Sequence, residues 1–151
     1  MLRFFKKISL KSLGHVYQLG HTISESCPCP IRPYAGAFTV VDLNGIHDVT
    51  LLFCGCETKE FLFLQLLRFG WFPATVKAPR TAITLRMLKF FQILSFESKS
   101  TAFEFESTLS RMTDNTGTRH VKVMFFHLPQ QMFMIYLLSL EVLHRPAARR
   151  A

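Results

Sequence analysis

The sequence has no hydrophobic run long enough to cross a membrane. A membrane-spanning helix needs about 18 or more consecutive apolar residues, and the nearest stretch, residues 132–143, is shorter and contains Glu141. A secretory signal peptide is also missing from the start of the sequence, because Lys6, Lys7 and Lys11 interrupt every apolar run there. We therefore expect a soluble intracellular protein without a membrane partner, in which thiols stay reduced.

The usual motifs of a catalytic site are missing as well. The sequence contains no Gly-rich phosphate-binding loop and no nucleophile elbow. A reactive cysteine needs a nearby base, whereas His47 lies on the opposite face of a predicted strand from Cys54 and far along it. We expect neither catalysis nor a small-molecule substrate. A thiol enzyme is kept as an alternative, and it would need a depressed cysteine pKa that zinc chelators do not affect.

Acidic residues are scarce at both ends of the chain, and the net charge is +8. Residues 1–24 contain no Asp or Glu, and residues 119–151 contain only Glu141. A basic surface attracts nucleic acid, so we expect DNA or chromatin as partner and a nuclear location. The candidate nucleic-acid-binding residues are Arg3, Lys6, Lys7 and Lys11. Two alternatives are that the charge only keeps an apolar, cytoplasmic chain soluble, or that the basic start is a mitochondrial presequence.

A β-hairpin is the clearest structural element that the sequence predicts. Residues 38–43 and 46–53 are rich in β-forming residues, and Asn44-Gly45 between them is a typical hairpin turn. The prediction leaves open whether short neighbouring strands extend this hairpin into a larger sheet. The hydrophobic content of 49% is enough for a packed core. The predicted core residues are Phe53, Leu66, Trp71, Phe72, Leu88, Phe91 and Phe96.

Three or four helices are predicted after the hairpin, which makes the fold class α+β. The first runs through residues 62–69, capped by Thr58 and ended by Gly70. An extended segment over 71–79 follows, because Pro73 and Pro79 bracket it. A second helix runs from Arg80 to about Phe96, and a third from about Ser100 to the polar stretch 113–118.

The character of the sequence changes after Gly117. Residues 118–151 are rich in Met and Phe and end in a basic tail. A helix from Pro129 to about Leu143 would be apolar on nearly every face and would require burial. We therefore divide the chain into a domain over 1–117 and a divergent apolar and basic tail over 118–151.

Two pairs of closely spaced cysteines are candidates for a metal site. Cys27 and Cys29 precede the hairpin, and Cys54 and Cys56 follow its second strand. A hairpin returns the chain close to where it began, so four thiolates could meet in a closed zinc site, with His15, His21 and His47 as further candidates. Gly55 would relieve the strain of the tight spacing. The alternative is that Cys54 belongs to the buried strand face and that Cys27 and Cys29 are free loop thiols.

Several longer motifs resemble a known family. The stretches VYQLGHTISESCPCP, NGIH followed by FCGC, WFPAT, LSFESK and TDNTG occur in this order. Together they resemble the cysteine-cluster domain of the CxC kind, second type, that is associated with KDZ transposases in fungi. The resemblance covers about residues 3–117. It implies a zinc-chelating module, N-terminal to a transposase catalytic domain of the RNase H-like class, that contributes DNA, chromatin or protein binding rather than strand-transfer chemistry.

The resemblance also implies a set of zinc ligands. Matched by position, the candidates are His21, Cys27, His47, Cys54 and Cys56, while Cys29 is peculiar to this sequence. The hairpin region is then a small zinc-cluster-like unit. A transposase or another protein is a further partner that the family implies.

The sequence departs from the family pattern at both ends. Relatives have further cysteines and histidines upstream of the position of Met1, so we expect part of the cluster to be missing. Beyond Gly117 the family continues into a polar helical region that this sequence does not match. The carboxylates of the catalytic domain are missing too. We therefore expect a truncated, transposon-derived copy, and the alternative is an inert remnant or interaction module with neither metal nor DNA binding.

Overall fold

The computed structural model describes residues 8, 10–21, 25–33, 36–57 and 60–114. Its fold is α+β, as predicted. The elements, in chain order, are β1 (Val16–Gln18), β2 (Pro30–Ile31), β3 (Phe38–Asp42), β4 (Gly45–Cys54), α1 (Leu62–Arg68), β5 (Trp71–Pro73), β6 (Thr81–Thr84), α2 (Leu85–Ser98) and α3 (Ala102–Thr113).

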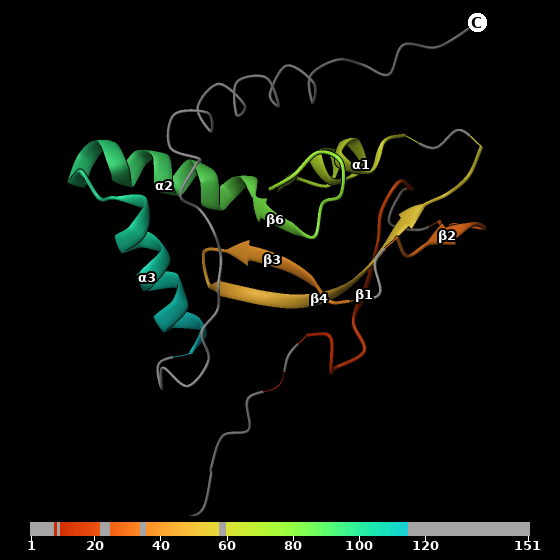
Figure 1. Ribbon diagram of the computed structural model, residues 1–151, viewed down its shortest axis with the longest axis horizontal. Helices are drawn as coiled ribbons and strands as arrows, with labels where there is room; N and C mark the ends of the chain where they lie inside the picture. The colour runs from red at the N-terminus through yellow and green to blue at the C-terminus, as the bar shows by residue number, and fades with distance from the viewer. Residues whose placement is uncertain (1–7, 9, 22–24, 34–35, 58–59, 115–151) are drawn as a thin grey trace, which may run out of the picture.

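The predicted hairpin is confirmed, and it forms the centre of a mixed sheet. β3 and β4 pair antiparallel, and Asp42 lies opposite Gly45 at the turn. The strand order is β1-β4-β3-β6-β5, and β2 pairs with the end of β4 outside this path. β1 pairs with β4 in parallel, and β6 pairs with β3 in parallel. Figure 1 shows α2 over the sheet and α3 beside the end where the hairpin turns.

The two faces of the sheet carry separate hydrophobic clusters. On one face Val41, Ile46 and Ile83 are buried under α2 and α3. On the other face Val40, Val49 and Trp71 pack with Leu66 of α1. Neighbouring strand residues alternate between the two clusters, as the period of a β-strand requires. The helix that packs on the second face, α1, has 7 residues and is shorter than α2 and α3.

Six of the seven predicted core residues are buried, and Phe96 is the exception. Phe96 is 74% exposed, whereas Phe91 on the same helix is 9% exposed. Five residues along an α-helix correspond to a rotation of about 140°, so the two rings face in different directions. The side of α2 that packs on the sheet carries Met87, Leu88 and Phe91. The prediction of Phe96 as a core residue was wrong.

The predicted helix from Arg80 begins later in the structure. Thr81–Thr84 form β6, because β-branched residues there pair with β3. Thr84 is the N-cap of α2, and its side chain accepts a hydrogen bond from the Met87 amide. The third predicted helix is α3, which starts with a capping box between Thr101 and Glu104.

The described part of the chain therefore holds three helices, none of which is long and apolar enough to span a membrane. Other predictions fall outside the described residues. These are the basic residues Arg3, Lys6 and Lys7, and the helix over 129–143. The predicted cap at Thr58 is wrong, because the N-cap of α1 is Phe61, which makes no side-chain capping hydrogen bond.

Candidate metal centre

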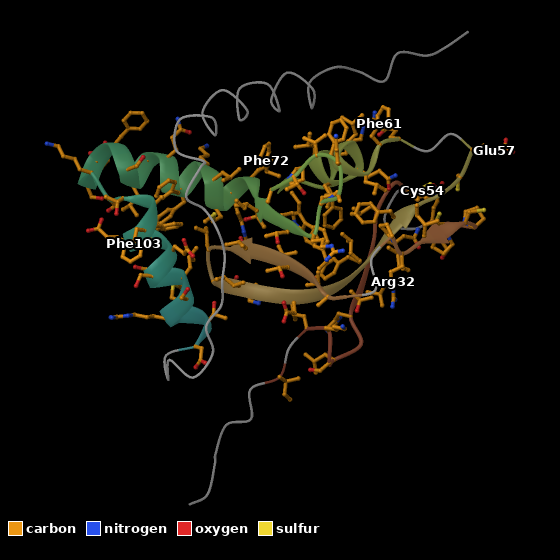
Figure 2. The ribbon with its side chains drawn as sticks, viewed as in Figure 1. Arg32, Cys54, Glu57, Phe61, Phe72 and Phe103 are labelled. Carbon is orange, nitrogen blue, oxygen red and sulfur yellow. The ribbon has the colours of Figure 1, made fainter. Side chains whose placement is uncertain are left out.

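Four side chains that can bind a metal converge beside the carboxyl end of β4. The ligand atoms of His21, Cys27, Cys54 and Cys56 all lie within 4.8 Å of one another. Cys27 and Cys54 are buried, and Cys56 is partly buried. Figure 2 shows Cys54 at the end of β4. Residues from three separate segments thus form one cluster of three thiols and one imidazole.

The sheet topology brings these segments together. β1 runs parallel to β4, with Gln18 opposite Leu52, so the chain leaves β1 toward His21 at the edge where β4 ends in Cys54. β2 runs antiparallel to the end of β4, with Pro30 opposite Cys54, and Cys27 lies just before β2. The cluster therefore joins the segments next to β1 and β2 to the end of β4.

Two glycines allow the close approach of these segments. A Cβ atom on Gly20 would lie 2.4 Å from the Cβ of Cys54, and Gly20 has a φ of +87°. A Cβ atom on Gly55 would lie 2.6 Å from the Ile31 side chain and 2.8 Å from the Cys29 carbonyl oxygen. That carbonyl also accepts a hydrogen bond of 2.9 Å from the Gly55 amide. A larger residue at either position would push the ligand segments apart.

A buried glutamine holds the backbone of Cys54. Gln65 of α1 is 3% exposed. Its Oε1 accepts from the Cys54 amide at 2.9 Å, and its Nε2 donates to the Cys54 carbonyl at 3.1 Å and to the Glu60 carbonyl at 2.9 Å. Through Gln65, α1 thereby fixes the position of Cys54, a candidate metal ligand on β4.

Three of the distances between ligand atoms in the cluster are close to those of a tetrahedral zinc site. Bonds of about 2.3 Å to sulfur and about 2.0 Å to nitrogen put two sulfurs about 3.8 Å apart and a sulfur and a nitrogen about 3.5 Å apart. The Sγ atoms of Cys27 and Cys56 are 3.7 Å apart. Nε2 of His21 lies 3.3 Å from Sγ of Cys54 and 3.7 Å from Sγ of Cys56.

The thiols influence one another's ionisation. Burial raises the pKa of Cys27, but hydrogen bonds with the Cys29 backbone and with the Cys56 and Cys54 side chains outweigh it and lower the pKa to about 7. The hydrogen bond with Cys54, followed by burial and the Cys27 thiol, raises the pKa of Cys56 to about 12. Within the cluster, one ionised thiol is therefore more stable than two or three ionised thiols together. A divalent cation would stabilise all three thiolates at this spacing.

Comparison with known protein families gives a match to the region that contains this cluster. A family model described as CxC2-like cysteine cluster associated with KDZ transposases matches residues 10–117. The chain belongs to this family. No curated protein and no solved structure matches the chain.

Four of the ligand candidates in this CxC2-like domain come together, and the others lie elsewhere. The thiol of Cys29 is exposed and lies outside the cluster. The backbone carbonyl of Cys29 accepts a hydrogen bond from the Gly55 amide. His47 lies seven residues before Cys54 on β4, and its Nε2 is 2.9 Å from Oδ1 of Asn44. A strand advances about 3.3 Å per residue, so His47 is too far from the cluster to join it. His15 is exposed before β1 and is not part of the cluster.

Sequence reasoning missed two supporting residues of the CxC2-like domain. Gln65 is the one uncharged polar residue in the apolar helix 62–68, and such an isolated polar residue is a signal for a buried hydrogen-bonding role. Gly20 directly precedes His21, but its contact with Cys54 could not be recognised without the parallel pairing of β1 and β4.

Of the four basic residues predicted to bind nucleic acid, Lys11 is the one that the structure describes, and its side chain is exposed.

Proposed function

We propose that this chain is a non-catalytic, zinc-stabilised module that contributes DNA binding to a KDZ-type transposase in the nucleus. The observation that carries this proposal is the convergence of the ligand atoms of His21, Cys27, Cys54 and Cys56 within 4.8 Å of one another. Three thiols and one imidazole are a donor set typical of structural zinc. Four protein ligands would fill the coordination sphere and leave no open position for substrate, which supports a structural role for the metal.

A metal at this position would contribute to the stability of the fold. The ligands join the segments around β1, β2 and β4, and β1 and β2 are short strands with little packing of their own. A site whose ligands meet only in the folded chain contributes its binding free energy to folding. The metal would thereby hold the edge of the sheet on which Tyr17 and other β1 residues lie.

Metal content tests the zinc part of the proposal. Native mass spectrometry of the purified chain should find close to one zinc per chain. A Cys54→Ser, Cys56→Ser double variant should lose the zinc and unfold at lower temperature. Cys29→Ser is the matched control, because its exposed thiol lies outside the cluster, and it should keep both metal and stability. A wild-type chain that is metal-free and as stable as the double variant would refute the proposal.

The charge of the chain supports the DNA part. The sequence carries a net charge of +8, and basic residues predominate at both ends. Contacts of Lys and Arg with phosphates release counterions, so the affinity should fall steeply as salt rises. A mobility-shift series with duplex DNA over increasing salt measures this slope. No shift at low salt would refute DNA binding while leaving the zinc site untouched.

A second candidate, protein binding, is supported by an exposed apolar surface on α2 and α3. Its residues, each at least 47% exposed, are Phe90, Ile93, Phe96, Phe103 and Met112. Exposed apolar side chains that lie together are typical of protein contacts, and Phe90, Ile93 and Phe96 follow one another at three-residue steps along α2. A concentration-dependent increase of the solution mass, reversed by polar substitutions at Phe96 and Phe103, would favour this candidate over DNA binding.

A further inference from the structure

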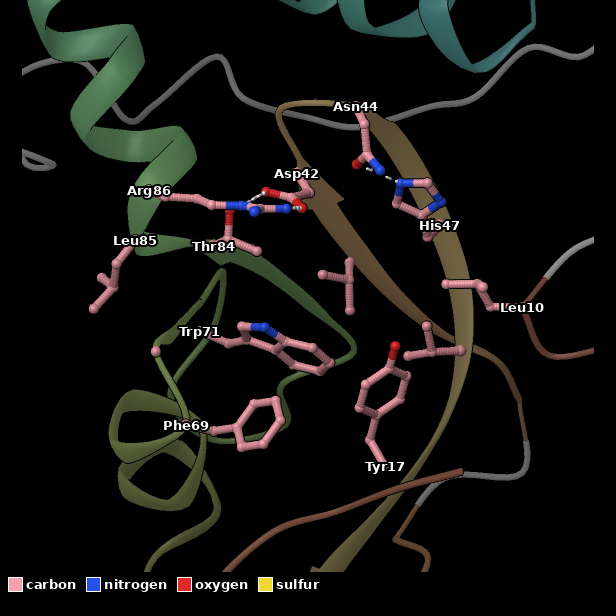
Figure 3. A pocket seen from close by; sticks show the side chains of 13 residues that line it. Leu10, Tyr17, Asp42, Asn44, His47, Phe69, Trp71, Thr84, Leu85 and Arg86 are labelled. Carbon is pink, nitrogen blue, oxygen red and sulfur yellow. Dashed lines mark hydrogen bonds and ion pairs between the residues drawn. The ribbon is translucent and has the colours of Figure 1, made fainter. Parts of the chain in front are cut away.

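A pocket of about 540 Å³ lies on the sheet face that carries Val40 and Val49, away from the metal cluster. Its volume is within the range of sites that bind small ligands, roughly 300–1,000 Å³. The pocket exists because α2 and α3 cover the opposite face, while on this face the covering by α1 and the segment around Leu10 is incomplete. The larger side chains that line it are shown in Figure 3.

One end of the pocket is formed by three aromatic rings. Tyr17 comes from β1, Phe69 follows α1, and Trp71 lies on β5. The Phe69 and Trp71 rings are nearly perpendicular, with centroids 4.9 Å apart. Tyr17 lies 5.4 Å from Trp71 and 6.3 Å from Phe69, and both pairs are steeply inclined. Phe69 is 43% exposed and belongs to neither hydrophobic cluster, so the core does not need its ring.

The other end of the pocket is polar and carries a paired carboxylate. Arg86 binds Asp42 through Nε, at 2.7 Å, and through Nη2, and Thr84 donates to the same carboxylate at 2.7 Å. Asp42 is 8% exposed, whereas the Arg86 side chain is 66% exposed. His47 and Asn44 are hydrogen-bonded to each other beside this pair. Figure 3 shows both pairs above the aromatic rings.

This charge distribution distinguishes between two kinds of ligand that aromatic rings bind. A methylated ammonium ion is favoured by rings together with an available carboxylate. Here the carboxylate of Asp42 is buried and paired with Arg86, and the side of this ion pair that reaches the surface is the guanidinium. Lys11, next to the pocket residue Leu10, is exposed as well. The pocket therefore suits an aromatic ligand attached to an anion.

We propose that this pocket receives an unstacked nucleobase of single-stranded nucleic acid. The base stacks against Phe69 and Tyr17 above Trp71, and the adjoining phosphate faces Arg86. Aromatic side chains combined with a positively charged rim are the usual means of binding single strands. Asn44 and His47 supply hydrogen-bonding groups for the edge of the base. The proposal rests on the nucleic-acid role proposed above and specifies the form of nucleic acid that this face binds.

Trp71 provides a reporter for this pocket, because it is the only tryptophan in the sequence. The zinc-loaded, full-length chain is titrated with a short oligothymidylate and, separately, with a duplex of similar length. The single strand should quench the Trp71 fluorescence to saturation, and the duplex should not. Phe69→Leu should weaken binding of the single strand roughly tenfold or more. Phe61→Leu is the matched control, because Phe61 is 73% exposed and does not line the pocket, and this variant should bind like the wild type.

Each result of this titration has a defined meaning. Equal affinity of Phe69→Leu and wild type, or no quenching by the single strand, would overturn the pocket proposal. If the duplex still shifts in the mobility assay in that case, DNA binding by another surface stands. Quenching by a trimethyl-lysine peptide and not by the oligonucleotide would also overturn the proposal, because the pocket would then bind a cation.

Discussion

Nε2 of His21 lies 3.3 Å from Sγ of Cys54, although 33 positions separate the two residues in the sequence. The contact follows from the parallel pairing of β1 with β4, which directs His21 and Cys54 to the same edge of the sheet. The metal cluster and this part of the sheet therefore depend on each other. Changes that separate β1 from β4 should affect metal binding even when they leave every ligand in place.

Gly20 and Gly55 provide the first test of this dependence. Gly55→Ala should lower the free energy of unfolding by about 1–3 kcal/mol, since the new methyl group would overlap Ile31 and the Cys29 carbonyl. Gly20→Ala should cost more, because its positive φ adds about 1 kcal/mol to the overlap with Cys54. Chemical denaturation of the zinc-loaded chains measures both values.

The control for these glycines is Gly36→Ala, because a Cβ atom on Gly36 has no neighbour within 4 Å. Its unfolding free energy should stay within about 0.5 kcal/mol of the wild type. If all three variants had the same stability, the close contacts around the cluster would not constrain the fold.

Gln65 should matter through its hydrogen bonds rather than through its volume. Gln65→Met keeps the length of the side chain but leaves the amide and carbonyl of Cys54 without partners in a buried place. Each unsatisfied group costs about 1–3 kcal/mol, so we expect a loss of roughly 2–4 kcal/mol and weaker zinc retention against a chelator. Gln92→Met, the same change on the partly exposed α2, should have little effect on either. A Gln65→Met variant that retains zinc as well as the wild type would contradict the role assigned to Gln65.

Asp42 should make stability depend on pH in the acid range. The hydrogen bond from Arg86 lowers the pKa of Asp42 from 3.8 to about 2, against the opposing effect of burial and with a further contribution from Thr84. The carboxylate therefore stabilises the fold fully above pH 4, and this contribution disappears as the pH falls through 2. Its size should be roughly 1–2 kcal/mol.

The measurement compares wild type with Asp42→Asn between pH 6 and pH 2. Loss of zinc in acid affects both proteins, so the difference between their unfolding free energies isolates Asp42. That difference should be constant near pH 6 and shrink below pH 4. A difference independent of pH would mean that the ion pair with Arg86 does not stabilise the folded chain.

Phe91 and Phe96 test which side of α2 faces the core. Phe91 is buried against Phe105 of α3, with ring centroids 4.9 Å apart. Phe91→Ala should therefore cost about 3–5 kcal/mol. Phe96→Ala should cost less than about 0.5 kcal/mol, because the ring is largely exposed. Thermal melting of the two variants distinguishes them, and equal losses would place Phe96 in a contact with another part of the chain.

The sequence by itself determined the features that arise from neighbouring residues. Asn44-Gly45 favours a hairpin turn through its local backbone preference, and the hairpin is present. The Thr101–Glu104 capping box and the apolar side chains of Leu88 and Phe91 are equally local, so the third helix and most of the core could be predicted. Two of the candidate metal ligands, Cys54 and Cys56, were recognisable because they occur together.

The tertiary structure alone decided which distant residues meet. His21 and His47 were equal candidates, and only the pairing of β1 with β4 selects His21, because ligand geometry depends on strand register rather than on sequence spacing. The same holds for β6, where pairing with β3 overrides the helical pattern of residues 80–84. It also holds for the pocket, since Tyr17, Asp42 and Trp71 are far apart in the chain and share one face only after the sheet has assembled.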